Sequence, residues 1–235
     1  IVCYVDSAPA TTFSRKRKDP LEYFLVEELP AKTSIADVHI DALYHEKYNR
    51  SVLQQLRYQF VNRDPLMHLF EIDERTSILK ISQTIDRDTV CERNSPCLAW
   101  LHVGVRPEQY SDTIRILVEI LDANDHRPRF PERVIHIHTS EDVAVGTSWP
   151  IPMAKDVDSG PNGQVHYDLA TETERFELIT TKDSSNNTMD VRLKVVKALD
   201  REVEPNYALK VKAFDGGRPP RTGSIIVNVT VDDLN

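Results

Sequence analysis

Three stretches of the chain alternate between apolar and polar residues with a period of two. They are DTIRILVEIL at 112–121, NYALKVKAF at 206–214 and SIIVNVTVDD at 224–233. The apolar positions are Ile114, Ile116, Val118 and Ile120, then Tyr207, Leu209, Val211 and Ala213, and finally Val227, Val229 and Val231. This period predicts β-strands with one buried face. Turn clusters such as DSGPNG and DGGRPPRTG accompany them, and LQQLRYQFV at 53–61 is the one stretch with some helical character, so we predict an all-β antiparallel sandwich.

An internal repeat divides the chain. LVEELPAKTS at 25–34 matches TSEDVAVGTS at 139–148, which aligns Glu27 with Glu141. Further along, Asp86-Arg87-Asp88 aligns with Asp200-Arg201-Glu202, and each copy closes on an acidic segment, DANDHRP at 122–128 and the shorter DLN at 233–235. A chain of 235 residues with 40% hydrophobic content can bury two cores. We therefore predict an N-terminal tail at 1–19 and two domains, at 20–126 and 127–235.

Two of the three cysteines lie close together in the sequence. Cys91 and Cys97 enclose only ERNSP, a polar segment with a proline, which favours a short disulfide loop. A zinc site would need two further Cys or His ligands at comparable spacing, and a redox pair is usually C-x-x-C. A disulfide places the chain in an oxidising compartment. Cys3 is then left over, either unpaired in a tail or available for an intermolecular bond.

Charge and glycosylation motifs agree with an extracellular chain. Acidic residues outnumber basic ones by 37 to 29, for a formal net charge of -8, which argues against a nucleic-acid binder and makes cations the natural partners. No apolar run approaches the ~20 residues of a membrane span. The sequons predict glycosylation at Asn49, Asn186 and Asn228, with Asn228 on the outer face of its strand.

Taken together, these motifs resemble two consecutive extracellular cadherin repeats. The matching pieces are Glu27 and Glu141 in the first strands, the DRD and LDRE triplets, DANDHRP, DVDSGPNG at 156–163 and AFDGG at 213–217. DRDTVCERNSPC is also similar to the DRE-x-x-C-x5-C signature of the first repeat in protocadherins. The resemblance implies two tandem seven-stranded Greek-key sandwiches joined end to end by a calcium-binding linker. It also implies three calcium ions at that linker.

The resemblance assigns the calcium ligands position by position. Two ions are implied at Glu27, Asp86, Asp88, Asp125 and Asp158 with the Ala123 carbonyl, and the third at Asn124, Asp156, Asp158 and Asp215 with the carbonyls of His126 and Asn162. Calcium takes six to eight oxygens, which carboxylates and carbonyls supply. His126 stands where the family has Asn, and because that position contributes a backbone oxygen we expect the change to be harmless.

The two ends of the repeat pair differ. The first repeat has DALYHEKY and VGVRPEQ where the second has ligand motifs, which implies a membrane-distal repeat with no calcium site at its outer end. The opposite end carries half of a further site, whose missing partners would belong to a third repeat. Its residues are Glu141, Asp200, Glu202, Asp233 and Asn235.

The function implied by this resemblance is calcium-dependent cell–cell adhesion at the cell surface. The partner is expected to be the same protein on an opposing cell or another cadherin, and the chain to be membrane-anchored through a part outside this sequence. The alternative is a structural or force-bearing filament with a heterophilic partner. No tryptophan lies in the first few residues, so strand-exchange adhesion has no anchor, and Trp100 and Trp149 are expected to pack in or on sheets.

Other chemistry is not supported by the residues. An enzyme with a small-molecule substrate is not expected, because the carboxylates are accounted for as ion ligands and no nucleophile with a base or Gly-rich phosphate loop is present. His136 and His138 share one face of a strand without a third ligand, so we interpret them as strand surface. The basic run Arg15–Lys18 is interpreted as a solvated tail rather than a processing site.

Overall fold

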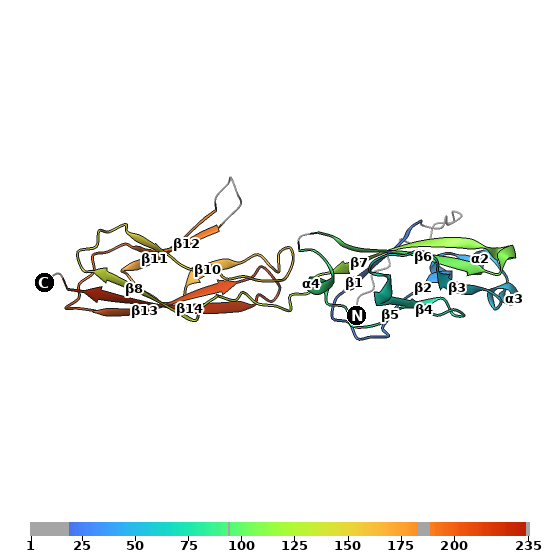
Figure 1. The fold of residues 1–235 in the computed structure, drawn as a ribbon, viewed down its shortest axis with the longest axis horizontal. Helices are drawn as coiled ribbons and strands as arrows, with labels where there is room; N and C mark the ends of the chain where they lie inside the picture. The colour runs from blue at the N-terminus through green and yellow to red at the C-terminus, as the bar shows by residue number, and fades with distance from the viewer. Residues whose placement is uncertain (1–18, 94, 183–188, 234–235) are drawn as a thin grey trace. The chain divides into compact units, whose positions relative to one another are not determined.

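The computed structural model describes residues 19–93, 95–182 and 189–233, and the chain divides into two compact units, up to Ala123 and from Asn124 onward (Figure 1). Each unit is a sandwich of two β-sheets around its own apolar core. Cys3, the run Arg15–Lys18, Asn186 and Asn235 lie outside the described residues.

The described residues of the first unit form seven strands in a four-stranded and a three-stranded sheet. The larger sheet has the order β1-β7-β6-β3 and the smaller one β2-β5-β4. The strands are β1 Leu21–Val26, β2 Ser34–Asp37, β3 Arg57–Phe60, β4 Phe70–Ile72, β5 Ile78–Ile81, β6 Cys97–Arg106 and β7 Asp112–Leu121. The four predicted inward residues of β7 are all fully buried in the core, because alternate residues of a strand face opposite sides of its sheet.

The second unit repeats this plan, with seven more strands in the part of it that the structure describes. Its sheets have the orders β10-β13-β14-β8 and β11-β12-β9. The strands are β8 Val134–Ser140, β9 Ser148–Pro150, β10 His166–Leu169, β11 Phe176–Lys182, β12 Met189–Val195, β13 Asn206–Phe214 and β14 Thr222–Asp232. The predicted apolar faces of β13 and β14 form much of this core. The all-β, tandem-sandwich prediction is therefore confirmed.

One strand pair in each unit is parallel. β1 pairs with β7 and β8 pairs with β14 in parallel register, whereas the other pairs are antiparallel. A parallel pair needs a long crossover, and here the crossover is the rest of the unit. The chain therefore begins and ends each unit on the same sheet, so that the residues after β1 and after β7 lie at the same end. This placement brings Glu27 to the DAND segment.

The prediction of helical character for LQQLRYQFV holds only at its start, where Leu53 ends helix α3 (Arg50–Leu53). Its second half is strand β3, because Leu56 and Tyr58 alternate into the core and the strand pairs with β6. The helical turns of the chain are each too short to show a 3.6-residue period. They are α1 Val38–Asp41, α2 Tyr44–Lys47, α3 Arg50–Leu53, α4 Arg87–Val90 and the 3-10 turns Met67–Leu69 and Glu108–Tyr110.

The two tryptophans and the two neighbouring histidines lie on the faces of β-sheets, as predicted. Trp100 projects from the outer face of β6 and is 43% exposed, whereas Trp149 in β9 is half-buried against the second core. His136 and His138 lie on the exposed face of β8.

Two of the predicted glycosylation sites lie within the described residues. Asn49 is exposed and caps α3, and Asn228 lies half-buried on the outer face of β14.

Candidate calcium centre

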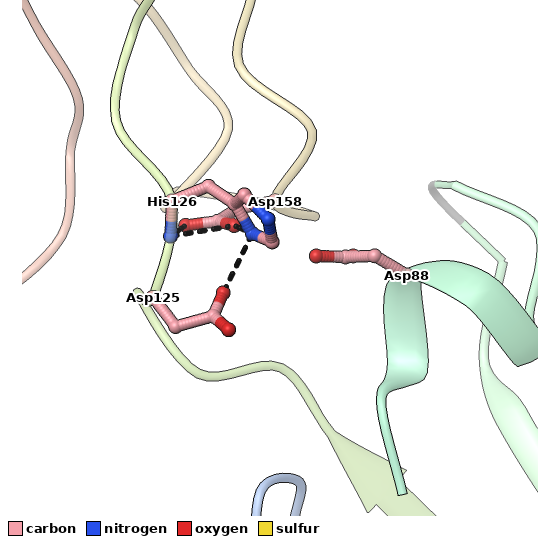
Figure 2. Close-up of side chains that lie close together, drawn as sticks. All are labelled: Asp88, Asp125, His126 and Asp158. Carbon is pink, nitrogen blue, oxygen red and sulfur yellow. Dashed lines mark hydrogen bonds and ion pairs between the residues drawn. The ribbon is translucent and has the colours of Figure 1, made fainter.

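The segment that opens the second unit places a histidine between two carboxylates. Figure 2 shows the ring of His126 beside Asp125 and Asp158, with Nδ1 at 2.7 Å from Asp125 Oδ1 and 2.9 Å from Asp158 Oδ1. The backbone N–H of His126 also donates to Asp158. Burial lowers the pKa of His126, but the charges of Asp125 and Asp158 and their hydrogen bonds outweigh it, so this pKa is raised. The side chain expected to be harmless is therefore in direct contact with two of the predicted ligands.

Three acids of the second unit are buried. Asp156, Asp158 and Asp215 are 2%, 0% and 1% exposed. Asp156 and Asp158 flank Val157, and Asp156 accepts a hydrogen bond from the backbone N–H of Asp158. Asp215 follows β13 and accepts from the backbone N–H groups of Gly217 and Arg221. Burying charged carboxylates is costly unless cations or hydrogen bonds compensate, so a cation bound beside these three acids would add to the stabilisation that their hydrogen bonds give.

Asn124 and the AFDGG motif fit closely together. The Asn124 amide donates to Asp215 at 3.2 Å and to the Pro219 carbonyl at 2.9 Å. A Cβ on Gly217 would lie 2.0 Å from Asn124 Nδ2, so only glycine leaves room for this side chain. The buried Asn124 Oδ1 accepts no hydrogen bond from the described residues. Asn162, half-buried, lies in the nearby turn that also supplies the Pro161 carbonyl to Gly216.

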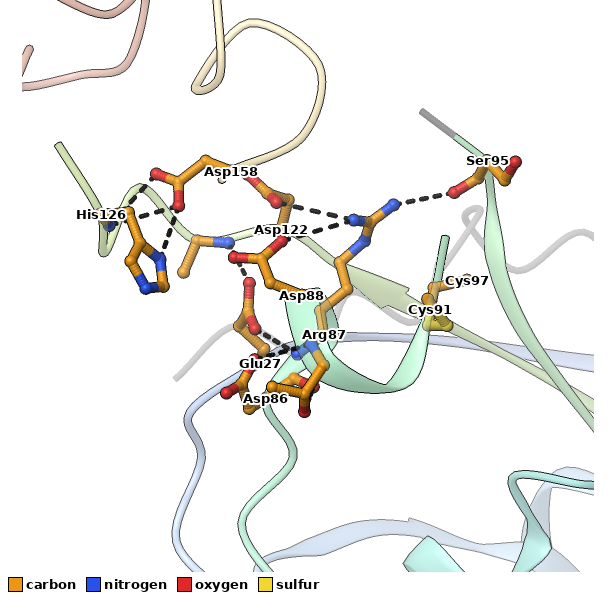
Figure 3. A network of polar contacts seen from close by, with 12 residues as sticks. Glu27, Asp86, Arg87, Asp88, Cys91, Ser95, Cys97, Asp122, His126 and Asp158 are labelled. Carbon is orange, nitrogen blue, oxygen red and sulfur yellow. Dashed lines mark hydrogen bonds and ion pairs between the residues drawn. A yellow bond between two sulfur atoms is a disulfide. The ribbon is translucent and has the colours of Figure 1, made fainter. Parts of the chain in front are cut away.

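In the first unit, Glu27 connects three segments that are far apart in sequence. It directly follows β1 and is only 3% exposed. One carboxylate oxygen accepts from the backbone N–H of Arg87, and the other from the backbone N–H of Ala123 at 2.9 Å (Figure 3). Because each oxygen has a second lone pair, both remain able to coordinate a cation.

The DRD triplet forms the start of α4. Asp86 is the N-cap residue, and its side chain accepts from the Thr89 backbone N–H at 3.1 Å. This turn leaves Asp88 facing Glu27 and Asp122, whose carboxylates offer oxygens within 4.8 Å of one another. Arg87 is buried between them, with Nη1 3.9 Å from Asp88 and 3.7 Å from Asp122, and it donates to the Ser95 carbonyl.

Two residues of this acid group, Asp122 and Arg87, were not among the site residues predicted from the sequence. Asp122 opens the DAND segment but has no place in the ligand pattern that the resemblance supplied, and Arg87 had no role. The structure brings both into the acid group, where Arg87 supplies the one buried cation among the described residues. The acidic DAND run was the signal for Asp122. No sequence signal indicated the Arg87 contacts.

The C-terminal end of the second unit repeats the Glu27 arrangement. The backbone N–H of Arg201 donates to Glu141 at 3.4 Å, and the side chain of Asp200 accepts from Val203 at 3.2 Å. The Arg201 guanidinium pairs with Asp233 at 3.0 Å. Glu202 is exposed in the same turn. These contacts parallel those of Glu27, Arg87 and Asp86, so the internal repeat extends to the hydrogen bonds of the acidic ends.

Next to the first acid group, the structure joins Cys91 and Cys97 in a disulfide (Figure 3). Cys91 ends α4 and Cys97 begins β6, with their Cα atoms 5.6 Å apart. The bond therefore links the DRD turn to β6. Strand β6 pairs with β7, the strand that leads to Ala123.

The donor set fits calcium rather than a softer metal. The groups gathered in each unit are carboxylate and amide oxygens, with His126 as the one nitrogen among the described predicted ligands. Calcium prefers oxygen ligands, and transition metals prefer nitrogen or sulfur. Buried acids and the unpaired Asn124 oxygen are what a hard cation would satisfy. The acids of each unit are therefore suited to such a cation: Glu27, Asp86 and Asp88 in the first unit, and Asp125, Asp156, Asp158 and Asp215 in the second.

These observations define a class: tandem all-β repeats that carry acidic, oxygen-rich ends. A cadherin-like domain model matches residues 20–106, and a cadherin domain model matches 135–232. The chain belongs to the cadherin superfamily and contains two cadherin repeats. Calcium binding and cell adhesion are typical of this superfamily.

Within the superfamily, the chain is similar to several protocadherins. The chain is 35% identical over 221 residues to protocadherin-19 of Danio rerio, covering 92% of this chain and 19% of that protein. It is 32% identical over 239 residues to protocadherin-17 of Homo sapiens, covering 99% and 20%. A solved structure of protocadherin gamma C5 EC1-3 has a TM-score of 0.75 at 29% identity, covering 91% of this chain and 66% of that one.

The chain spans about a fifth of the length of these two curated relatives. Among the described residues, no helix is long and apolar enough to cross a membrane.

Proposed function

We propose that the chain is part of the ectodomain of a protocadherin-like protein that mediates calcium-dependent, homophilic cell–cell adhesion. It would act on the extracellular side of the plasma membrane, anchored through a part outside this sequence. The partner would be the same protein on an opposing cell or another cadherin. Membership in the superfamily and the similarity to protocadherins support this proposal.

The observation that carries the calcium part is the burial of four acids. Glu27, Asp156, Asp158 and Asp215 are each at most 3% exposed. Like charges confined at low dielectric repel strongly, so bound cations would stabilise the folded chain. We infer that the predicted ligands of both units together hold three calcium ions, whose charge of about +6 would offset seven carboxylates. The domain boundaries at 20–126 and 127–235 remain part of this proposal.

The residues of the chain would have different tasks in binding. Glu27 would present oxygens that its two backbone hydrogen bonds already orient. Asp86 would be fixed by its capping bond to Thr89, and Asn124 by its bond to Pro219. Such preorganisation lowers the entropic cost of binding. Glu141, Asp200, Glu202, Asp233 and Asn235 would form the second, incomplete site.

Bead aggregation tests the adhesive function directly. Beads coated with the full ectodomain should clump in millimolar calcium and disperse in EDTA. Beads that carry Asp125→Ala should aggregate far less, whereas Asp168→Asn, an exposed acid of β10, should behave as wild type. Calcium-independent clumping would contradict the proposal. An absence of clumping in calcium would instead support the alternative, a structural filament with a heterophilic partner.

A further inference from the structure

The second unit carries a basic groove on the outer face of its larger sheet. The groove has a volume of about 870 Å³. Five cationic side chains line it together with a single acid, Glu132, and all six are exposed. The cations are Arg127, Arg129, Arg133, Lys210 and Lys212. In a chain with a net charge of -8, this groove is a local reversal of charge.

Strand register explains the hollow between these cations. Lys210 and Lys212 lie on the same exposed face of β13, because they are two residues apart. This spacing places them about 7 Å apart along the strand. Lys212 lies opposite Ser224 of β14, and the next outward residue of β14 is Thr222. Long lysines beside short hydroxyl side chains leave space above β14. The floor of the groove therefore offers hydroxyl groups, and its wall offers ammonium groups.

The arginines on the other side are held by backbone contacts. A Cβ on Gly223 would lie 2.1 Å from the Pro128 carbonyl oxygen, so glycine lets the 127–133 segment approach β14. Arg129 and Lys155 exchange two backbone hydrogen bonds of 2.8 and 2.9 Å, and the Arg133 carbonyl accepts from Ile226. The backbone is thus fixed, while the guanidinium groups stay exposed.

The five cations are available to an outside ligand. Among the described residues, none of their side chains makes an ion pair or a hydrogen bond that the structure records. Elsewhere in the same unit, exposed cations such as Lys197 and Arg201 do pair with acids. An open groove with five such cations and one acid fits a ligand with several negative charges along its length.

We propose that this groove binds a sulfated polysaccharide of the extracellular space. Arginine forks bind sulfate and phosphate oxygens in pairs, and lysines add point charges. Thr222 and Ser224 can hydrogen-bond sugar hydroxyls. Six charged residues and four apolar residues line the groove, whereas charged residues are depleted at the centre of a protein–protein interface. The disulfide and the sequons place the chain outside the cell, where such polysaccharides occur. The inference does not depend on the proposed adhesion or on calcium.

The test is binding of a size-defined heparin oligosaccharide to the chain by titration calorimetry, at about 0.15 M salt. Lys210→Gln combined with Lys212→Gln should weaken binding about tenfold and reduce its salt slope by about two. The matched control, Lys194→Gln with Lys197→Gln, removes two charges in and just after β12 and should bind as wild type. Arg133→Gln is a second groove variant, and melting curves verify that each variant folds.

Several results would overturn the proposal. They are no binding of heparin by the wild-type chain, equal binding of chemically desulfated heparin, or equal weakening by the β12 control. Preferential binding of phosphatidylserine vesicles would assign the groove to a membrane surface instead. Binding of sulfated but not desulfated oligosaccharide, lost in both groove variants and unchanged in EDTA, would support it.

Discussion

At the scale of the residue, Glu27 has a structural role besides its proposed calcium role. Its two carboxylate oxygens accept the backbone N–H groups of Arg87 and Ala123, which belong to the DRD turn and to the end of β7. A buried N–H that loses its acceptor costs about 1–3 kcal/mol. The residue therefore stabilises the acidic end of the first unit even when no ion is bound.

We predict that Glu27→Ala lowers the free energy of unfolding by about 3 kcal/mol in EDTA, because two backbone donors lose their acceptor. Glu27→Gln keeps one amide oxygen and should cost less. The matched control, Glu74→Gln, changes an exposed glutamate of the same unit and should leave stability unchanged. Urea unfolding in EDTA measures all three. If Glu27→Ala lost stability only in calcium, the carboxylate would act as a ligand alone.

The phenol of Tyr58 should make the stability of the first unit depend on pH in the alkaline range. Burial and then the charge of Asp37 raise the pKa of its phenol to about 12. An unfolded tyrosine titrates near pH 10, so this contribution to stability is intact below about pH 10 and is lost between about pH 10 and 12. Over this pH range, the free energy of unfolding should fall by about 2–3 kcal/mol because of Tyr58.

Tyr58→Phe should therefore lose less stability over that window than the wild type. Urea unfolding at a series of alkaline pH values measures the slope. Equal slopes for the two proteins would show that the Tyr58 phenol titrates normally in the folded chain. The comparison isolates Tyr58 because the burial-raised pKa of Tyr23 is present in both proteins.

At the scale of the element, the Cys91–Cys97 bond joins α4 to β6. A bridge over so short a loop removes little entropy from the unfolded chain, so its contribution should be about 2 kcal/mol. Replacing both cysteines by alanine should lower the free energy of unfolding by that amount and remove its sensitivity to reductant. Thiol labelling of the unreduced, denatured chain should detect one thiol, that of Cys3. More than one reactive thiol per chain would contradict the pairing.

Strands could be predicted where one face is buried, because burial imposes a period of two on the sequence. This held for β7, β13 and β14. The turns α1 to α3 could not, since each has four residues and shows no period. Acids of the candidate site were indicated by repeated motifs, whereas the Arg87 and His126 contacts depend on how distant segments meet. The basic groove has the same origin, since its cations lie between residues 127 and 212.

At the scale of the whole molecule, the chain carries both buried acids and a groove lined by exposed cations. The buried acids are Glu27 in the first unit and those of the DVD and AFDGG motifs in the second, while the cations of the groove face solvent in the second unit. Calcium should stabilise the chain by linkage, because these ligands converge only when each unit is folded. The acidic net charge of -8 adds to this effect, since bound cations reduce self-repulsion.

We predict that millimolar calcium raises the free energy of unfolding by about 1–3 kcal/mol, given dissociation constants near 10⁻⁴ M for extracellular sites. Asp125→Ala should abolish most of this gain, because its side chain is a predicted ligand while its backbone carbonyl still accepts from Arg221. Asp168→Asn, an exposed acid, should retain the full gain. Thermal unfolding with calcium and with EDTA compares the three proteins. An unchanged calcium response in Asp125→Ala would show that the DAND segment does not bind the ion, since the folded backbone is preserved and only the carboxylate is lost.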